Sequence, residues 1–388
     1  MRFPEFSGEW ENTLLNCYLE ENKERNKKGL FTKNDVLSVS GDYGVVNQIE
    51  LLGRSFAGKS VLDYHVVRSG NIVYTKSPLK EYPYGIVKVN DGIDGIVSTL
   101  YAVYTVKENA DGKFIENYFG LPSRTNRYFK PIVRIGAKHD MKIGNDEVLA
   151  NHVIFPRLDE QKRISDFISL LDQRIATQRK IIEDLKKLKD AICNLNFISG
   201  SSLTLGDIGY FVRGLTYSAS DVIDDTSGTA VMRSNNISNG DPVNFKELVW
   251  VNKTPNHEQI LRDGDILICM ANGSSPLVGK ASYYVDCGMY SATVGAFCGI
   301  YRSYNPLTKW LFQSKHYKKH IQRCIQGGNG AIANIYPEDI LAISFNIPSG
   351  YERVLNTLNS LEDKYLLEQK LLCRYLTVKS HLLAQLFI

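Results

Sequence analysis

The chain has 388 residues, with 46 Lys plus Arg against 42 Asp plus Glu, so its formal net charge is +4. Charged residues make up 23% and hydrophobic residues 43%, which excludes a histone-like basic tail and an acidic disordered chain. This length suggests two or three domains, each with enough apolar material for a core. The 22 Tyr residues suit either binding surfaces or hydrogen-bonded cores.

The seven cysteines are scattered, and no two have the spacing of metal ligands. An odd, scattered set predicts neither a zinc site nor a disulfide framework, so we expect a reducing, cytoplasmic location. The first ten residues lack a basic segment followed by an apolar run, and no uninterrupted apolar stretch of about 18 residues occurs. We therefore expect neither secretion nor membrane spanning.

The first part of the chain has the pattern of a mainly β domain. Runs rich in β-branched and aromatic residues, separated by Gly, Asn and Asp, predict strands at residues 70–75, 85–89 and 96–106. A short helix is expected at residues 116–127. No acidic residue lies between Asn117 and His139, a stretch that is rich in Lys and Arg.

A long helix is predicted to follow, from about Ile164 to Asn196. Its apolar residues alternate in steps of four and three, with Gln178 and Lys189 in the same register. At 1.5 Å per residue such a helix measures roughly 50 Å, longer than one domain is wide.

The second half repeats the first at an offset of about 190 residues. Arg68-Ser-Gly-Asn-Ile recurs as Arg262-Asp-Gly-Asp-Ile, and Ser77-Pro-Leu recurs as Ser275-Pro-Leu. Strands are predicted at residues 265–270 and 293–301, and a helix at 306–325. Residues 287–337 again contain no acid. An internal repeat of this length indicates a duplicated domain.

A second long helix ends the repeat, and 190 residues separate Gln178 from Glu368 and Lys189 from Lys379. We expect the two helices to pair antiparallel as a coiled coil; one amphipathic helix packed on each domain is the alternative. The expected fold class is α+β: a tandem duplication of two mixed α/β domains, separated by two antiparallel helices, with a pseudo-twofold axis. The predicted seam comprises Ile164, Ile168, Leu171, Ile175, Ile182, Leu185, Leu358, Leu361, Tyr365, Leu372, Tyr375 and Leu382.

The two acid-free stretches predict two positive faces for duplex DNA, because Lys and Arg neutralise phosphates while amide and guanidinium groups can read base edges. A solvated basic face without a ligand is the alternative for either stretch alone. Small polar loops after equivalent strands could also approach a groove, although turn chemistry would explain them equally well. The candidate DNA-binding residues are Lys76, Arg124, Arg127, Lys130, Arg134, Lys138, Asn272, Lys280, Lys315, Lys318, Lys319, Arg323 and Asn329.

Catalytic motifs are missing from the sequence. It contains no Walker-type phosphate loop, no Asn-Pro-Pro-Tyr methyltransferase motif and no zinc-peptidase or serine-hydrolase motif. Glu362-Asp-Lys364 matches the end of a nuclease motif but is interpreted as ordinary helical surface. We expect no catalytic residue and no metal site.

Several segments resemble the specificity subunits of type I restriction-modification systems. They are Phe3-Pro-Glu-Phe-Ser-Gly-Glu-Trp10, Pro156-Arg-Leu-Asp-Glu-Gln-Lys-Arg-Ile164 and its degenerate copy beginning Pro348-Ser-Gly-Tyr-Glu-Arg353. Two departures are Glu352-Arg353 in place of Glu160-Gln161, and Leu15-Asn-Cys17 where the second half has Leu205-Gly-Asp207.

The resemblance implies a division into residues 1–155 and 199–347, two target-recognition domains, and residues 156–198 and 348–388, two spacer helices. It implies a non-catalytic subunit that reads a bipartite, asymmetric DNA target, the helices fixing the half-site spacing. The implied partners are double-stranded DNA, two modification (methyltransferase) subunits and restriction subunits, with S-adenosylmethionine, ATP and Mg on those partners and no cofactor on this chain. A coiled-coil scaffold whose globular domains bind proteins is the alternative function.

Overall fold

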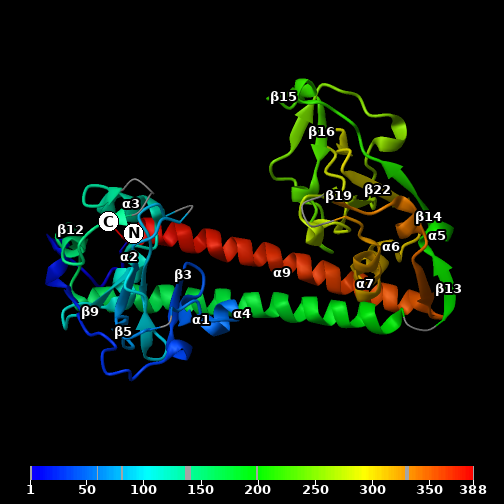
Figure 1. Ribbon diagram of the computed structural model, residues 1–388. Helices are drawn as coiled ribbons and strands as arrows, with labels where there is room; N and C mark the ends of the chain where they lie inside the picture. The colour runs from blue at the N-terminus through cyan, green and yellow to red at the C-terminus, as the bar shows by residue number, and fades with distance from the viewer. Residues whose placement is uncertain are drawn as a thin grey trace. The chain divides into compact units, whose positions relative to one another are not determined.

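The computed structural model describes residues 2–58, 60–79, 82–135, 141–197, 200–327 and 332–387. The chain divides into two compact units, residues 1–179 with 370–388 and residues 180–369 (Figure 1). Two long helices, α4 (Leu158–Asn196) and α9 (Tyr351–Leu386), each contribute one end to each unit. Within the described residues, no helix is both long and apolar enough to cross a bilayer.

The first unit is built on an antiparallel sheet of four strands. Their order is β2 (Leu19–Glu21), β9 (Tyr101–Val106), β6 (Ile72–Thr75) and β7 (Val87–Val89). The smaller antiparallel pairs are β1 (Glu11–Leu14) with β12 (His152–Phe155), β3 (Leu37–Ser40) with β4 (Gly44–Asn47), β5 (His65–Val67) with β8 (Gly95–Val97), and β10 (Arg134–Ile135) with β11 (Met141–Lys142).

Short helices complete the first unit: α1 (Gln48–Leu52), α2 (Gly112–Tyr118), α3 (Pro122–Phe129) and the 3-10 turns η1 (Leu15–Cys17), η2 (Lys33–Asp35) and η3 (Glu147–Leu149). Asp111 caps α2 by accepting a hydrogen bond of 2.7 Å from the Phe114 amide. The expected helix at 116–127 is therefore two helices. The main core combines the four-stranded sheet with Phe114, Ile164 and Leu386, so both long helices are anchored in it.

The second unit contains two sheets. The antiparallel one has the order β14 (Gly209–Arg213), β22 (Cys298–Ser303), β18 (Ile266–Cys269) and β20 (Ala281–Tyr283). The mixed one has the order β15 (Val222–Ile223), β17 (Val249–Val251), β16 (Thr229–Met232) and β21 (Ala292–Val294), in which β16 and β21 are parallel. Two further pairs are β13 (Ser201–Thr204) with β24 (Ser344–Ile347) and β19 (Ala271–Asn272) with β23 (Ala333–Asn334).

The helices of the second unit are α5 (Leu205–Ile208), α6 (Thr308–Gln313), α7 (Lys315–Cys324) and α8 (Pro337–Leu341), with the 3-10 turns η4 (Ala219–Asp221), η5 (Ser234–Asn236), η6 (His257–Gln259) and η7 (Ser275–Leu277). The single helix expected at 306–325 is interrupted at Ser314, whose ψ of 153° is extended. The Ser314 hydroxyl accepts a hydrogen bond from the Tyr317 amide and so begins a new helix.

The two units repeat one order of elements. A short strand that pairs with the last strand of the unit comes first, and a four-stranded antiparallel sheet follows. Across each sheet, the strands follow in the same order when they are ranked along the chain: first, fourth, second, third. This order is β2, β9, β6, β7 in the first unit and β14, β22, β18, β20 in the second. The strands predicted from the sequence are present, although residues 96–106 and 293–301 each contain two strands rather than one.

The long helices pack against each other within each unit. In the first unit Asp172 pairs with Lys379, and the Arg174 guanidinium donates to the Tyr375 hydroxyl at 3.1 Å. From Asp172 to Arg174 the residue number rises along α4, while the partner on α9 changes from Lys379 to Tyr375, a lower number. The two helices are therefore antiparallel here. All twelve predicted seam residues are buried or half-buried. Ile164 and Ile168 belong to the first unit's core and Leu358 to the second's, so the ends of the seam pack on globular elements.

Many tyrosines lie in the cores rather than at the surface. Tyr74, Tyr104, Tyr301 and Tyr317 are each at most 1% exposed. Each hydroxyl donates to a backbone carbonyl, for example Tyr301 to Leu205 at 2.7 Å and Tyr317 to Gly279 at 2.9 Å. These hydrogen bonds satisfy the hydroxyls, so core packing explains this part of the tyrosine content.

Candidate nucleic-acid interface

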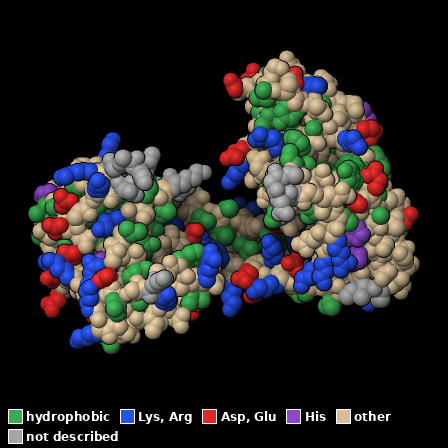
Figure 2. All heavy atoms as spheres, in the orientation of Figure 1, with side chains coloured by type: hydrophobic (Ala, Val, Ile, Leu, Met, Phe, Trp, Pro, Cys, Tyr) green, Lys and Arg blue, Asp and Glu red, His purple; other side chains and the backbone are tan. Residues whose placement is uncertain are grey.

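Helix α7 carries the most strongly basic surface of the second half. Tyr317 and Ile321, four residues apart, are buried and anchor the helix to the core. Lys315, Lys319 and Arg323, also four apart, are therefore exposed along another face. Figure 2 shows Lys and Arg side chains gathered on the part of the second unit where Figure 1 labels α7.

The charges on α7 are not neutralised by neighbouring acids. No ion pair within the described part of the chain includes Lys315, Lys318, Lys319 or Arg323. A helix dipole favours Arg323 in the last turn but disfavours Lys315 in the first. Helix stability therefore does not explain Lys315, whereas attraction of an anionic ligand does.

A loop of the antiparallel sheet meets α7. A cavity of about 120 Å³ is lined by Ser275, Lys280, Lys318 and Gln322, among others. Gly279 permits the close approach: its φ is +78°, and a Cβ there would lie 2.0 Å from Cγ2 of Ile321. The structure thus brings together Lys280 and Lys318, two candidates that are 38 residues apart.

Asn272 lies at a different cavity of about 410 Å³, which Arg233 and Phe297 also line. Its Nδ2 donates to the Ser234 hydroxyl at 3.2 Å, and its Oδ1 accepts from the Ser274 amide at 2.9 Å. Asn272 is therefore held in a fixed orientation. Sequence patterns did not single out Arg233 or Phe297, because neither lies in a basic run or a recognised motif.

In the first unit, some of the candidate residues on and near α3 have exposed side chains, and one has a side chain that turns inward. Arg127 and Lys130 are exposed, and no ion pair is found for them within the described residues. Arg134 is 84% exposed and lies 4.0 Å from Glu147. Arg124 instead turns inward, where its guanidinium donates to the carbonyls of Tyr118 and Phe387.

Burial lowers the pKa of two of these groups. It lowers the pKa of Arg124, which also stacks over the Tyr118 ring with 5.0 Å to the centroid. Burial likewise lowers the pKa of Lys76, whose Nζ donates to Asn145 Oδ1 at 2.6 Å. Both side chains therefore have contacts within the unit. The candidates Lys138 and Asn329 lie outside the described residues.

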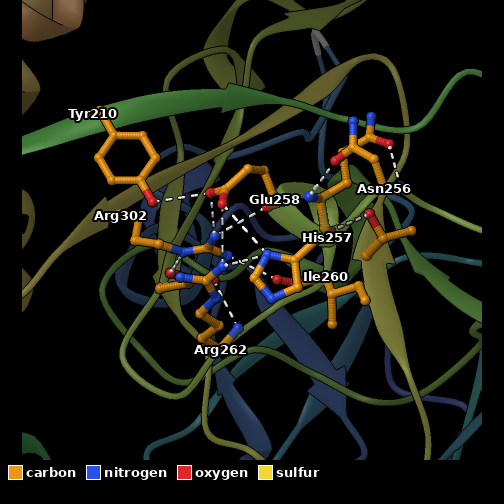
Figure 3. A network of polar contacts seen from close by, with 10 residues as sticks. Tyr210, Asn256, His257, Glu258, Ile260, Arg262 and Arg302 are labelled. Atoms are coloured by element: carbon orange, nitrogen blue, oxygen red, sulfur yellow. Dashed lines mark hydrogen bonds and ion pairs between the residues drawn. The ribbon is translucent and has the colours of Figure 1, made fainter.

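Arg302, which belongs to the second acid-free stretch, is a structural residue (Figure 3). It is 2% exposed, and its guanidinium makes two hydrogen bonds to Asp265, at 2.8 and 2.7 Å. It also donates to Glu258, which accepts a hydrogen bond from the Tyr210 hydroxyl at 3.0 Å. The hydrogen bonds that Arg302 donates to the Asp265 carboxylate raise the pKa of Arg302. The charge of Arg302 is therefore paired with acids inside the unit.

Glu362 is also buried, which corrects the interpretation of Glu362-Asp-Lys364 as ordinary surface. It is 2% exposed and forms an ion pair with Lys189. Its Oε1 accepts a hydrogen bond of 2.5 Å from the Tyr283 hydroxyl. Within the described residues no group of three or more His, Cys, Asp or Glu side chains has the arrangement of a metal site.

No family model matches the chain. The specificity subunit of the type I restriction enzyme StySPI from Salmonella potsdam is 32% identical over 146 residues, which are 36% of this chain and 30% of that protein. The EcoKI specificity subunit from Escherichia coli (strain K12) is 31% identical over 144 residues, 35% of this chain and 30% of that protein. The match thus spans under a third of these curated relatives.

Two solved structures are similar over the whole chain. The S subunit of a type I restriction-modification system from M. genitalium has a TM-score of 0.57 and 15% identity, covering 100% of this chain and 99% of that one. A chain from a structure concerned with complex assembly and conformational transition of the type I R-M system has a TM-score of 0.51 and 14% identity, covering 98% of both. These similarities establish the fold, and the resemblance noted from the sequence is confirmed.

Proposed function

We propose that this chain is the DNA specificity subunit of a type I restriction-modification complex and directs that complex to a bipartite, asymmetric target. The observation that carries the proposal is the face of α7, where Lys315, Lys319 and Arg323 project from an anchored helix and form no ion pair with any acid in the described part of the chain. Cations fixed in this way suit the phosphates of duplex DNA, because their binding releases condensed counterions. The local identity to two specificity subunits supports the same function.

Each unit would read one half-site. The repeated strand order of the two antiparallel sheets supports an internal duplication, with recognition domains at residues 1–155 and 199–347. The side chains that the two units present differ, so the half-sites would differ in sequence. Residues 156–198 and 348–388 would form an antiparallel coiled coil about a pseudo-twofold axis, and the expectation that these helices set the half-site spacing stays a prediction.

The chain would position chemistry rather than perform it. We infer that two modification subunits supply methyl transfer from S-adenosylmethionine, and that restriction subunits supply the ATP- and Mg-dependent steps. This chain would hold no cofactor and would act in the cytoplasm. Phosphate contacts would orient each unit on the duplex, and base contacts would then select the half-site.

Methylome sequencing tests the proposal directly. Cells with an intact gene should carry a methylated motif of two short half-sites separated by unspecified bases, and the motif should disappear when the gene is deleted. Reintroducing the chain with residues 199–347 exchanged for those of another specificity subunit should change one half-site and leave the other. A methylome that is identical with and without the gene would reject the proposal.

A binding assay separates this function from the alternative of a protein-binding scaffold. The purified complex should shift random duplex DNA at low salt, with an affinity that falls steeply as salt rises. A scaffold that binds only proteins would give no shift at any salt concentration.

A further inference from the structure

The cavity beside Asn272 has features that the basic surface on α7 lacks. Its volume of about 410 Å³ is within the range of roughly 300–1,000 Å³ typical of small-molecule sites. Tyr217, Phe297 and Ile332 supply apolar side chains to its lining, Gly295 supplies backbone, and Arg233 and Asn272 supply polar groups. Among the described residues that line the cavity there is no Asp or Glu.

The aromatic wall is held in place by the backbone. Phe297 is 65% exposed, but its carbonyl accepts hydrogen bonds from the amides of Met270 and Ala271, at 2.9 and 3.1 Å. Gly295, two residues earlier, donates to the Met232 carbonyl at 2.9 Å. The turn that carries the ring is thus fixed between strands of two sheets. Because the turn is already ordered, a ligand that contacts the exposed ring does not have to order the loop, and the entropic cost of binding is lower.

The polar groups at the cavity have hydrogen-bonding capacity left. Arg233 is exposed, and no ion pair includes it within the described residues. The Asn272 side chain uses one N–H toward Ser234 and one lone pair toward Ser274. A second lone pair on Oδ1 remains for a ligand, while a further hydrogen bond joins the Asn272 side chain to Cys269. Together these two side chains can pair with both donors and acceptors on a planar edge.

This combination suits a nucleobase better than a phosphate. A phosphate is held by several donors that converge on its oxygens, whereas here aromatic and aliphatic walls surround one guanidinium. A base offers two π-faces for Tyr217 or Phe297 and an edge of donors and acceptors for Arg233 and Asn272. Bases inside a duplex are read by elements that protrude into a groove. A cavity can receive only a base that has left the stack.

We propose that this cavity of the second unit receives one base extruded from its DNA half-site, stacked on Phe297 and Tyr217 and read by Arg233 and Asn272. The inference rests on the proposed function and adds a recognition mode to it. Extrusion loses the stacking of the base on its neighbours in the duplex, and stacking on aromatic side chains offsets this loss. The base at that position would be selected strongly, because a wrong edge would leave the polar groups unpaired.

The first unit offers a matched control. The turn between β8 and β9 occupies the place of the turn between β21 and β22, and it ends at Leu100, which is 66% exposed. Leu100 is an aliphatic side chain at the position of Phe297. Substituting it removes an equally exposed apolar group without touching the cavity.

A second substitution narrows the cavity without disturbing the fold. A Cβ at Gly295 would lie 3.5 Å from Cε1 of Tyr217 and 3.5 Å from Cγ1 of Val231, which are ordinary van der Waals distances. Gly295→Ala should therefore fold normally and add a methyl group to the lining of the cavity. Equal thermal unfolding midpoints for Gly295→Ala and the native chain would verify this.

The test uses the complex assembled with its modification subunits and the target found by methylome sequencing. Duplexes carry 2-aminopurine, whose fluorescence rises when a stacked neighbour leaves, beside one base of the second half-site at a time, so that the base under test keeps its own edge. One position should brighten when the complex binds. Phe297→Ala and Gly295→Ala should abolish that response, and Phe297→Ala should weaken binding by roughly 5- to 150-fold, the range for loss of base–aromatic stacking.

Leu100→Ala should leave the brightening unchanged. A signal that persists in Phe297→Ala and Gly295→Ala would overturn the inference, since it would report extrusion into a methyltransferase subunit. The inference would also be overturned if the variants lost affinity for DNA while no 2-aminopurine position brightened with the native chain. The Phe297 ring would then contact a stacked base in the groove. A complex that binds no duplex at all would instead reject the proposed function.

Discussion

Lys189 and Glu362 form an ion pair inside the second unit, with 2.8 Å between Nζ and Oε2 and only 4% and 3% of the two side chains exposed. The first unit contains its counterpart, in which Lys379 Nζ lies 2.5 Å from Asp172 Oδ1. Adding 190 to Lys189 gives Lys379, and subtracting 190 from Glu362 gives Asp172. The two long helices therefore carry the same charged contact twice, once in each unit.

The buried pair predicts a large stability effect. Lys189→Met should destabilise the chain by about 3–5 kcal/mol, because Glu362 would stay buried with only the Tyr283 hydroxyl as partner. The double variant with Glu362→Met should recover most of this loss, since it leaves no unpaired charge. Urea unfolding followed by tryptophan fluorescence measures both, because the Trp310 ring centroid lies 5.9 Å from Lys189 Nζ.

Lys187→Met is the control for that experiment. Lys187 pairs with Glu183 on the helix surface, where the two side chains are 69% and 63% exposed. Removing such an exposed pair should leave the urea midpoint almost unchanged, because solvent screens the attraction. A similar loss in Lys187→Met and Lys189→Met would show that burial is not the reason.

Periodicity predicted much of this fold from the sequence. The 190-residue repeat and the steps of three and four located both long helices and their shared lysines. The burial of Glu362 was missed because helical periodicity predicts only contacts with the other long helix. Tyr283, which donates a hydrogen bond to Glu362, lies on a strand of the globular part. The break at Ser314 was missed because a serine that caps a new helix has the same composition signal as one inside a helix.

The candidate site was predicted less completely. A count of acids along the sequence found α7, but it also included Arg302, whose partner Asp265 is 37 residues earlier. Tyr301 and Ile266 are register partners on β22 and β18, so strand pairing brings that acid to the arginine. Arg233 follows β16 and Phe297 lies in the turn after β21, and these two strands pair in parallel in the mixed sheet. The strands are far apart in the sequence, so no local pattern reveals that the two residues line one cavity.

The exposed charges of α7 predict weaker DNA binding without loss of folding. Lys319→Gln and Arg323→Gln should each lower the affinity of the complex for duplex DNA and reduce the slope of log K against log salt by about 0.9. Binding isotherms at several salt concentrations measure this slope. Lys187→Gln removes an exposed charge from α4 and serves as the control. Unchanged slopes in both α7 variants would remove that helix from the interface.

Arg302 should show the opposite behaviour. Arg302→Met leaves Asp265 buried without its cation and should cost about 3–5 kcal/mol of stability in the second unit. Arg302→Lys keeps the charge but loses the two-pronged geometry, so its loss should be intermediate. Thermal unfolding ranks the three chains. At a temperature where all are folded, the salt slope of DNA binding should be the same; a reduced slope would place Arg302 among the phosphate contacts.

His65 predicts how the first unit responds to acid. The side chain is 1% exposed on β5, and its Nδ1 has no hydrogen-bond partner among the described residues. Burial, with repulsion from Arg25 and Lys76 and a weaker opposing effect of Glu21, lowers the pKa of His65 from 6.5 to about 4. Between these two pH values the unfolded chain binds a proton that the folded chain does not. Stability therefore rises with pH across this window and is lost as pH falls through it.

The His65 contribution should amount to about 2 kcal/mol between pH 6.5 and 4, allowing for solvent screening. His65→Phe keeps a buried ring but cannot bind a proton, so its urea midpoint should fall less than that of the native chain over this range. The difference between the two curves isolates His65 from the carboxylates, which titrate in both. His152→Gln, at an exposed position of β12, should reproduce the native curve. Parallel native and His65→Phe curves would mean that His65 is protonated equally in the folded and unfolded chains.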